Sequence, residues 1–409
     1  MFWLDDARRL PTVHKANPAK GQRRRVVSRT RRIAVWVSND LTFDQRVKKT
    51  CQTLEGLGWT PVLVGREMPN SVPWEGPWEA HRLKLAAHAG PRFYLSLQRE
   101  LHRWLRTHAS RLDAIWCNDL DTLAPAVWHG RLPVIYDSHE YFTEAAGLTG
   151  KPLKRALWLR LERWAFKSLP CMITVNESIA ESYRRTYGLE VLVVRNMPRR
   201  QTPVEVEGRS AFEAYGVPTD LPIALMQGAY MDRDRGAVEA VAALPGMKGI
   251  RLVLVGAGVE WEEAHAQVSE PEMEGRLHCI PKLPFEALRK LTASADVGLS
   301  LDKGSHGNYE MSLPNKLFDF MHARLPMVVT ARKEVAAIVR EHGLGEVVEH
   351  ATPSAVKAAV EKVLHRPRAE WAEALSKASE SFHWGVDEPQ IERALDTCLK
   401  AHLAGSHTQ

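Results

Sequence analysis

The chain has 409 residues, a length that predicts two or three globular domains. Its composition, with 44% hydrophobic and 25% charged residues, is close to that of soluble globular proteins. It excludes a collagen, a coiled coil and a wholly disordered chain. No apolar run approaches the roughly 20 residues of a membrane span, and no apolar secretion signal follows the first residue. We therefore expect a cytoplasmic protein that is neither transmembrane nor secreted.

The formal net charge of +6 is concentrated near the N-terminus, where residues 1–32 hold ten Lys or Arg against two Asp. The remainder of the chain is close to neutral, so the basicity belongs to a predicted flexible tail. The five cysteines are scattered and form no CxxC or Cys/His cluster. This pattern indicates free thiols in a reducing compartment and no metal site.

Short apolar runs alternate with longer amphipathic stretches along most of the chain, a pattern typical of parallel sheets covered by helices on both faces. Buried strands are expected in a first group at 33–38, 61–65, 114–117, 133–137, 171–175 and 191–195. A second group is expected at 222–228, 251–256, 276–280, 297–301, 326–330 and 346–348. The chain is thus predicted to be an α/β protein with two Rossmann-like domains facing each other across a cleft.

The stretch between the two groups of strands lacks a long apolar run and is predicted to be a linker. Near the C-terminus, a helical pattern at Ile391, Leu395 and Leu399 predicts a helix that crosses back to the first domain. The predicted organisation is a basic tail (1–31), an acceptor domain (32–200), a linker (201–220), a donor domain (221–380), and a crossover helix with its tail (381–409).

Polar residues follow three expected strands of the first group, where ligands of parallel sheets bind. Asn39 and Asp40 follow the first strand, Asp119 follows the third, and His139 follows the fourth. These are candidates to line an acceptor pocket, and a neutral His139 imidazole could bind a hydroxyl or transfer a proton. The alternative is that they cap helices and hold loops.

A glycine and two arginines follow the first strand of the second group. Gly228 ends that strand, and Arg233 and Arg235 precede a helix, where two guanidinium groups could clamp a diphosphate. The alternative is a charged surface loop in which Asp232 and Asp234 pair with these arginines.

A helix predicted at 316–323 carries Lys316 in its first turn, where a cation and free backbone N–H groups suit a phosphate. Asp319 lies near the same face and could accept a hydrogen bond from a ribose hydroxyl; the alternative is a solvated Lys–Asp pair. The Gly-x-Gly at 255–258 is a weak signal. No GxGxxG is present, so NAD binding is disfavoured.

Two helical stretches of the first domain, 92–112 and 151–169, are both basic and aromatic. Their apolar faces could simply pack on the sheet, leaving a solvated basic face. Alternatively, basic charge and apolar anchors together could dock the protein on an anionic membrane. Nucleic acid is not an expected partner, because the basic residues lie outside the predicted cleft and no known binding module occurs.

Taken together, eight segments resemble retaining glycosyltransferases of the GT-B fold, of the kind grouped in family 4. The resemblance covers about residues 32–390 and rests on NDLTFDQRVKKTCQTLEGLGWTPVLVG, WCNDLDTLAPA, VIYDSHEYFTE, MITVNESIAESYRRTYG, VVRNMP, QGAYMDRDRG, LVLVGAG and SLPNKLFDFMHARLPMVV. It implies a nucleotide-sugar donor in the second domain, an acceptor in the first, retention by front-face attack, and no metal or further cofactor.

By position, the resemblance assigns Gly228, Arg235 and Lys316 to the donor diphosphate. Asp319, on the same helix as Lys316, is assigned to the ribose. Asn315, at the start of that helix, is a further donor-binding candidate. His139 matches a histidine that approaches the donor sugar, so His139, Arg235 and Lys316 are the predicted catalytic residues.

The sequence departs from the family pattern at three places, one of which is Arg324, where the family has a small glycine. The first acidic residue of a conserved pair is replaced by Met311, and the adjacent Glu310 is the candidate substitute. Ala229 stands where the family has an arginine, and Arg233 is the candidate to supply that charge.

The predicted function is transfer of a sugar from a nucleotide-sugar donor to a glycan or lipid-linked acceptor in polysaccharide or glycolipid biosynthesis. Such an enzyme would work in the cytoplasm, with possible peripheral attachment to the inner face of the cytoplasmic membrane. Two alternatives stay open: a sugar-nucleotide epimerase of the same fold, and a catalytically silent glycosyltransferase-like partner. Met311 and Ala229 are the residues that keep the silent partner open as an alternative.

Overall fold

The computed structural model describes residues 30–42, 44–69, 71–304 and 307–406. Most of the predicted basic tail therefore lies outside the described residues. Its last residue, Arg31, already belongs to the first strand, where its guanidinium lies over the Trp59 ring.

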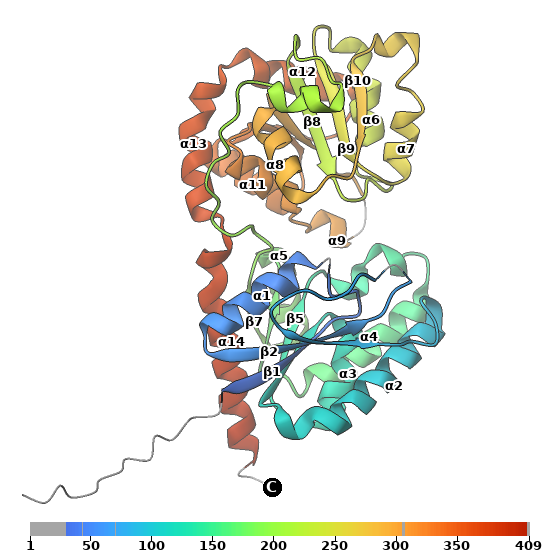
Figure 1. Cartoon of the computed structure of the whole chain (residues 1–409), viewed down its shortest axis with the longest axis vertical. Helices are drawn as coiled ribbons and strands as arrows, with labels where there is room; N and C mark the ends of the chain where they lie inside the picture. The colour runs from blue at the N-terminus through green and yellow to red at the C-terminus, as the bar shows by residue number, and fades with distance from the viewer. Residues whose placement is uncertain (1–29, 43, 70, 305–306, 407–409) are drawn as a thin grey trace, which may run out of the picture. The chain divides into compact units, whose positions relative to one another are not determined.

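The first sheet contains seven parallel strands in the order β3-β2-β1-β4-β5-β6-β7 (Figure 1). Neighbouring strands pair in parallel, so each connection must return along a helix or loop outside the sheet. The strands are β1 (Arg31–Trp36), β2 (Trp59–Arg66), β3 (Glu79–Leu83), β4 (Ala114–Asn118), β5 (Val134–Ser138), β6 (Cys171–Thr174) and β7 (Glu190–Val193).

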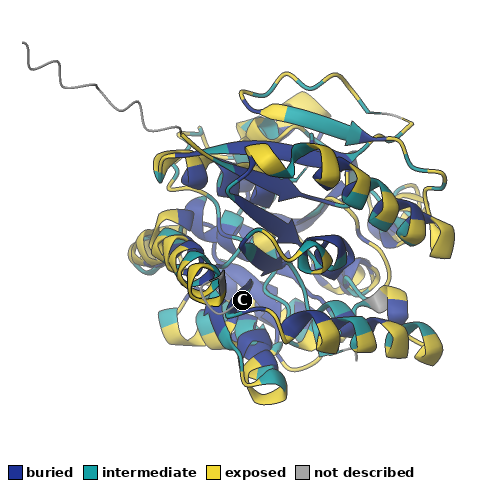
Figure 2. Cartoon of the chain, turned by 90° about the horizontal axis from the view of Figure 1, so that it is seen from below, coloured by how far each residue is buried: buried dark blue, intermediate teal, exposed yellow. Residues whose placement is uncertain are grey.

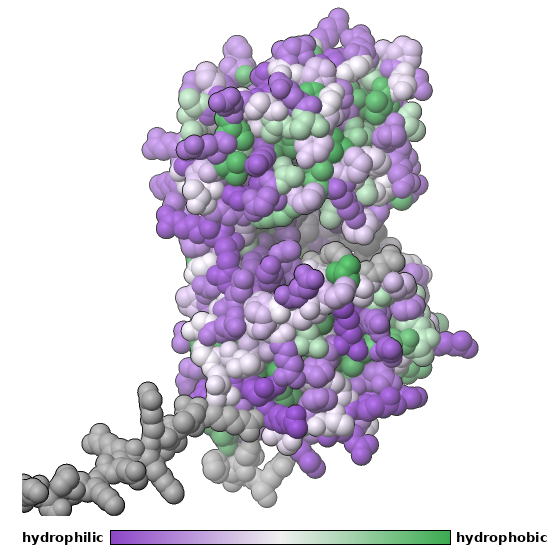
Figure 3. Space-filling model, in the orientation of Figure 1, coloured by the Kyte–Doolittle hydropathy of each residue, from purple (hydrophilic) through white to green (hydrophobic). Residues whose placement is uncertain are grey.

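Helices cover both faces of this sheet, so alternate strand residues enter two separate cores. Ala34 and Trp36 of β1 pack with α2 (Gly90–His108), α3 (Leu120–His129), α4 (Pro152–Phe166) and α5 (Glu177–Tyr187). Ile33 and Val35 pack on the other face, with α1 (Gln45–Gly56). Figure 2 shows the buried strands between helices whose outer faces are exposed, and Figure 3 shows a largely hydrophilic surface with smaller apolar groups.

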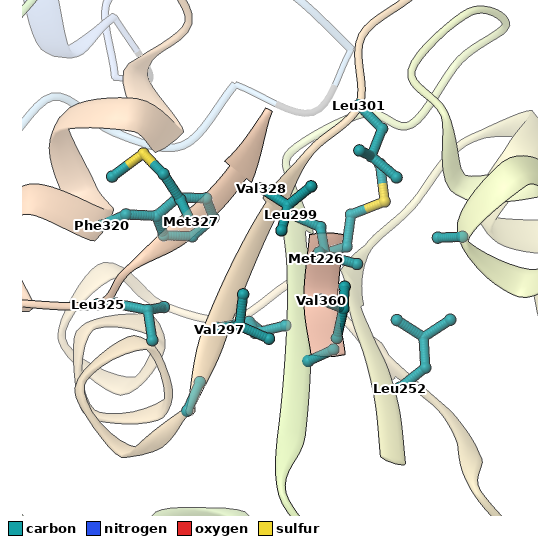
Figure 4. Close-up of a cluster of buried hydrophobic side chains, with 14 of the residues drawn as sticks. Met226, Leu252, Val297, Leu299, Leu301, Phe320, Leu325, Met327, Val328 and Val360 are labelled. Atoms are coloured by element: carbon teal, nitrogen blue, oxygen red, sulfur yellow. The ribbon is translucent and has the colours of Figure 1, made fainter. Parts of the chain in front are cut away.

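The second sheet contains six parallel strands in the order β10-β9-β8-β11-β12-β13. They are β8 (Ile223–Gly228), β9 (Arg251–Gly256), β10 (Leu277–Pro281), β11 (Val297–Ser300), β12 (Met327–Thr330) and β13 (Gly345–Val348). The helices are α6 (Ala237–Ala243), α7 (Val259–His265), α8 (Phe285–Ser294), α9 (Gly307–Glu310), α10 (Asn315–His322), α11 (Lys333–His342), α12 (Pro353–His365) and α13 (Arg368–Ser381). Figure 4 shows part of the core, where Phe320 of α10 lies among strand residues such as Val297 and Met327.

The sequence patterns predicted every strand of the two sheets except β3. This strand, Glu-Ala-His-Arg-Leu, lies at the edge and pairs only with β2. Four of its five side chains are partly or fully exposed, so it has no apolar run to recognise.

The C-terminal helix α14 (Trp384–Ser406) follows the second sheet in the chain but packs on the first, which confirms the predicted crossover. Trp384 is fully buried, its indole N–H donates to Thr53 Oγ1 at 2.9 Å, and the Lys49 ammonium lies over its ring. Asp387 pairs with Arg195 beyond β7 at 2.7 Å. None of the described helices, α14 included, is both long and apolar enough to cross a membrane.

We expect Trp384→Ala to lower the free energy of unfolding by about 3–5 kcal/mol, because it empties the site that holds α14 against α1. Trp128→Ala is the matched control. That side chain is 78% exposed, so its loss should change stability by less than about 0.5 kcal/mol. Urea unfolding monitored by circular dichroism measures both, and equal effects of the two substitutions would contradict this role of Trp384.

Candidate active site

A buried carboxylate, Asp302, gathers two predicted donor-binding cations just beyond the end of β11. Lys316 Nζ lies 2.8 Å from Asp302 Oδ2, and Arg235 Nη1 lies 3.1 Å from Oδ1. The Asp302 side chain is only 4% exposed. Burial alone would raise its pKa, but Lys316 and Arg235 hold the pKa below its usual value, so the group is a carboxylate.

The backbone brings Arg235 to this carboxylate through a close crossing. Gly236 adopts a φ of +85°, and a Cβ there would lie 2.3 Å from the Leu301 carbonyl oxygen. Only glycine fits, so the loop after Gly228 can pass directly over the end of β11. Lys316 reaches the same point from the first turn of α10.

Arg235 retains unused hydrogen-bonding capacity. Its guanidinium lies over the Tyr309 ring, 5.1 Å from the centroid, and gives one N–H to Asp302. Its Nε is buried and has no hydrogen-bond partner among the residues that the structure describes. The Arg235 side chain is still one-third exposed, so the accessible part of this planar guanidinium suits an anionic oxygen of a diphosphate.

The structure places Asp319 in a different hollow from this cluster. Gln227 Nε2 donates to Asp319 Oδ2 at 3.3 Å, and Arg289 and Phe285 line the same small space. Burial raises the pKa of Asp319 to about 6. Gln227 immediately precedes Gly228, so Asp319 adjoins the end of β8, and its predicted role at the ribose stays a prediction. Asn315 begins α10 and is exposed.

Two other predicted donor residues contact different partners. Arg233 is 76% exposed and lies 3.5 Å from Glu263. Glu310 pairs with Arg332, whose guanidinium also donates to the Gly304 carbonyl. Within the described ranges neither forms a hydrogen bond or ion pair with Asp302, so their part in donor binding stays a prediction.

Met311, at the position of the missing acidic residue, contacts the first half of the chain. Its carbonyl oxygen accepts from Asn176 Nδ2 at 2.6 Å, and its side chain packs on the core beneath α2–α5. The neighbouring Asn308 accepts from the Tyr141 N–H at 3.0 Å and donates to Glu140 Oε2 at 2.9 Å. The loop after His139 is therefore tied to the loop that precedes Lys316.

His139 lies among acidic and amide groups at the carboxyl ends of β4 and β5. Its Nε2 is 3.0 Å from Asn118 Oδ1 and 3.6 Å from Asp137 Oδ2. Its backbone N–H donates to Asp119 Oδ1 at 2.9 Å, and its Nδ1 is 3.6 Å from Asp119 Oδ2. Asp119 adopts a φ of 60°, a strained conformation for a non-glycine residue that turns its carboxylate toward His139.

These neighbours favour the protonated form of His139, whereas the sequence pattern suggested a neutral imidazole. Burial alone would lower its pKa, but the carboxylates of Asp119 and Asp137 raise the pKa to about 9. At neutral pH the ring is an imidazolium that donates hydrogen bonds and does not accept a proton. Its electrostatic effect on a developing negative charge is therefore larger than that of a neutral ring.

The strongest ion pair beside His139 involves a residue that was not predicted. Arg46 gives two hydrogen bonds to Asp137, at 2.6 and 3.1 Å, and a third to the Val194 carbonyl at 2.8 Å. Both charged side chains are 2% exposed or less. Burial would raise the pKa of Asp137, but Arg46 and His139 hold it well below its usual range. The only sequence signal for this pair was that Arg46 lies in the segment NDLTFDQRVKKTCQTLEGLGWTPVLVG, which carries part of the family resemblance.

Asp40 holds loop structure but caps none of the described helices, because the residue that caps α1 is Asp44. Its carboxylate accepts from the Thr42 N–H at 2.9 Å and from the Ser71 hydroxyl, and it lies 3.5 Å from Arg82 Nη2. Asn39 contributes its carbonyl oxygen to the Arg66 N–H. An acceptor-binding role for either residue stays a prediction.

Among the described ranges, no group of three or more His, Cys, Asp or Glu side chains is arranged to hold a metal ion. The clustered charges at this site are instead cations gathered on buried carboxylates.

Several solved structures share this two-sheet architecture. Sucrose-phosphate synthase from Thermosynechococcus elongatus aligns with a TM-score of 0.72 and 19% identity, covering 91% of this chain and all of that one. HepE from Anabaena, in complex with UDP and glucose, gives 0.68 and 13%, covering 90% and 100%. The lipopolysaccharide glycosyltransferase WaaG gives 0.66 and 15%, covering 88% and 99%.

Models of protein families, compared with the sequence, identify the family of this chain. Residues 44–198 match the glycosyl transferase 4-like domain, and residues 222–366 match glycosyl transferases group 1. The chain is a glycosyltransferase of the GT-B fold. The family resemblance drawn from the eight motifs is thereby confirmed. A comparison with curated protein sequences gives no match.

We expect Asp302→Asn to lower the free energy of unfolding by about 2–3 kcal/mol, because Lys316 and Arg235 lose their counter-charge. This is less than the ~3–5 kcal/mol of a fully buried pair, because Arg235 is one-third exposed. Inorganic pyrophosphate should then raise the melting temperature of the variant more than that of the wild type. Asp296→Asn, which removes the partner of Arg209, is the control and should leave the pyrophosphate response unchanged. If pyrophosphate raised the melting temperatures of Asp302→Asn and wild type equally, the binding of pyrophosphate by Lys316 and Arg235 would be contradicted.

The raised pKa of His139 predicts a pH-dependent contribution to stability. Since the pKa rises from 6.5 to about 9 on folding, the stabilisation is complete below pH 6.5 and is lost as pH rises through 9. The stability difference between wild type and His139→Gln should shrink over that range. Nuclear magnetic resonance titration of the ring checks the assignment, and a midpoint near 6.5 would refute it.

Proposed function

We propose that this glycosyltransferase moves a sugar from a nucleotide-diphosphate donor to a glycan or lipid-linked acceptor, with retention of anomeric configuration. The observation that carries the proposal is the convergence of Lys316 and Arg235 on Asp302 at the end of β11. Two cations at the carboxyl edge of a parallel sheet suit the diphosphate of such a donor. HepE, which shares the fold, is described in complex with UDP and glucose.

The chemical task of these cations is to stabilise the leaving group. Cleavage of the anomeric bond gives an oxocarbenium-like sugar and a diphosphate that gains negative charge. Lys316 and Arg235 are already ordered by Asp302, so little reorganisation is needed when that charge develops. Their combined charge exceeds that of Asp302 by one, which leaves a net attraction for the diphosphate. We propose that they replace a metal ion, and that no further cofactor is required.

His139 completes the proposed arrangement from the first sheet. As an imidazolium it can donate to an oxygen of the donor sugar, but it cannot serve as the base that deprotonates the acceptor. We therefore assign deprotonation to the departing phosphate oxygen, in a front-face attack that retains configuration. The bond from the anomeric carbon to the diphosphate breaks, the acceptor oxygen bonds to that carbon, and the acceptor proton passes to the phosphate.

A membrane-borne acceptor accords with the basic helices α2 and α4, so we propose peripheral attachment to the inner face of the cytoplasmic membrane. The structure changes which residues could serve as anchors. The stripe of α2 that includes Phe93, Leu97 and Trp104 is buried against the sheet, as the packing alternative predicted. Other apolar residues of α2 and α4 are exposed instead, among them Leu95 and Leu157.

We expect Lys316→Ala or Arg235→Ala to lower kcat at least about a hundredfold, because each removes a donor that stabilises the leaving diphosphate. Arg340→Ala, on the exposed end of α11, is the charge-matched control and should retain normal activity. Turnover is measured on a panel of nucleotide sugars by release of the nucleoside diphosphate.

Thermal-shift screening against the same nucleotide sugars, with analysis of the sugar-nucleotide products, separates the alternatives. An epimeric sugar nucleotide would identify an epimerase, and failure of every nucleotide sugar to bind would identify a silent partner. Near-normal turnover in both cation variants would overturn the assignment of the site.

A further inference from the structure

A surface outside the active site combines exposed apolar side chains with unpaired cations. On the outer faces of α2, α3 and α4, Trp128 is 78% exposed, Leu95 71%, Leu157 67% and Trp164 41%. Together with the buried Pro125 they line a groove of about 780 Å³. Monomeric proteins rarely expose large apolar side chains in such a group, and a cavity of this size is typical of a ligand site.

A second hollow, of about 680 Å³, adjoins the groove and has a different character. Arg106, Arg131, His102 and His129 line it, and no acidic residue does. Trp128 and His102 line both spaces, so the apolar groove and the cationic hollow are continuous at these two side chains. The pair of spaces thus has an apolar end and a cationic end.

The cations of this hollow have no protein counter-charge. Within the described residues, neither Arg106 nor Arg131 forms an ion pair, and the buried Nε2 of His129 has no hydrogen-bond partner. Burial lowers the pKa of His129, and the charges of Arg131 and His102 lower it further. An anion bound here would relieve this repulsion.

The helices around these spaces also lack exposed negative charge. In α2, Arg92, Arg99, Arg103 and Arg106 accompany a single acidic residue, Glu100, which is 18% exposed and pairs with Arg103. In α4 the only acidic residue, Glu162, is buried and bonded to the Tyr187 hydroxyl. The whole face therefore presents positive potential around an apolar groove.

We propose that this face binds an anionic phospholipid of a membrane surface, with a hydrocarbon chain in the groove between α2, α3 and α4 and the phosphate in the adjoining cationic hollow. The proposal deepens the proposed membrane attachment by naming the site and the lipid class. It does not depend on the donor chemistry, since none of the lining residues belongs to the Asp302 or His139 clusters.

The test is co-sedimentation with vesicles of phosphatidylcholine containing phosphatidylglycerol, compared with vesicles of phosphatidylcholine alone. Wild type should bind the anionic vesicles and be released by salt. Arg106→Gln with Arg131→Gln should weaken partition about 25-fold, at about fivefold for each cation. Trp128→Ser with Leu157→Ser should weaken it at least about tenfold, because both anchors are lost.

Matched controls change the same kinds of residue elsewhere. Lys248→Gln with Lys290→Gln removes two exposed cations of the second half, and Leu403→Ser removes a leucine that is 61% exposed. Both should bind within about twofold of wild type. Equal losses in these controls and in the face variants would show general charge or stability effects and would overturn the proposal.

Two further measurements separate other occupants. Sedimentation velocity without vesicles reports self-association, and a dimer dispersed by Trp128→Ser with Leu157→Ser would mean that a second copy covers the groove. A rise in melting temperature with inorganic phosphate, in a protein that does not bind vesicles, would mean that the hollow binds a free anion. Either result overturns the proposal. Pyrophosphate-induced thermal shifts on the same variants report the donor site, so a failure there concerns the proposed function alone.

Discussion

In each half of the glycosyltransferase a carboxylate is buried where a central strand ends, and such a charge requires nearby cations to remain ionised. Asp302 beyond β11 is held by Arg235 and Lys316, and Asp137 at the end of β5 is held by Arg46 and His139. Most side chains assigned to the chemistry are thus fixed by a structural ion pair. The cost of burying each carboxylate keeps its cations in place before any substrate arrives.

The Asp302 and His139 clusters differ in the charge that they present to a substrate. Around Asp302 the two cations outnumber the carboxylate and Arg235 is one-third exposed, so the cluster can accept an anion. Around His139 the two carboxylates of Asp119 and Asp137 balance the charges of the ring and Arg46, and they raise the pKa of His139 to about 9. The first arrangement suits a leaving diphosphate, and the second suits a hydrogen-bond donor toward a sugar. The Asn308 contacts with Glu140 and Tyr141 join the loops that carry them.

The membrane hypothesis shows how burial changes the meaning of a pattern. The amphipathic stripe of α2 is conspicuous in the sequence, yet the sheet covers it. The groove depends on Trp128 of α3 together with residues of α2 and α4, which meet only when the helices pack side by side (Figure 1). No periodicity within one helix could have predicted this combination.

The sequence by itself determined the fold class, the alternation of strands and helices, and the family. Each depends on local signals, namely continuous apolar runs in doubly covered strands and short motifs in a fixed order. It also identified Lys316, Arg235 and His139 as candidates because strand ends and helix starts are readable locally. The tertiary structure alone decided which partners they have. Asp302 joins two cations that lie 81 residues apart in the sequence, and Arg46 reaches Asp137 across 91 residues. Glu310 pairs with Arg332 and Arg233 pairs with Glu263, so neither joins the Asp302 cluster. Such distant pairings follow from the order of strands in the sheets, and so does the charge of His139.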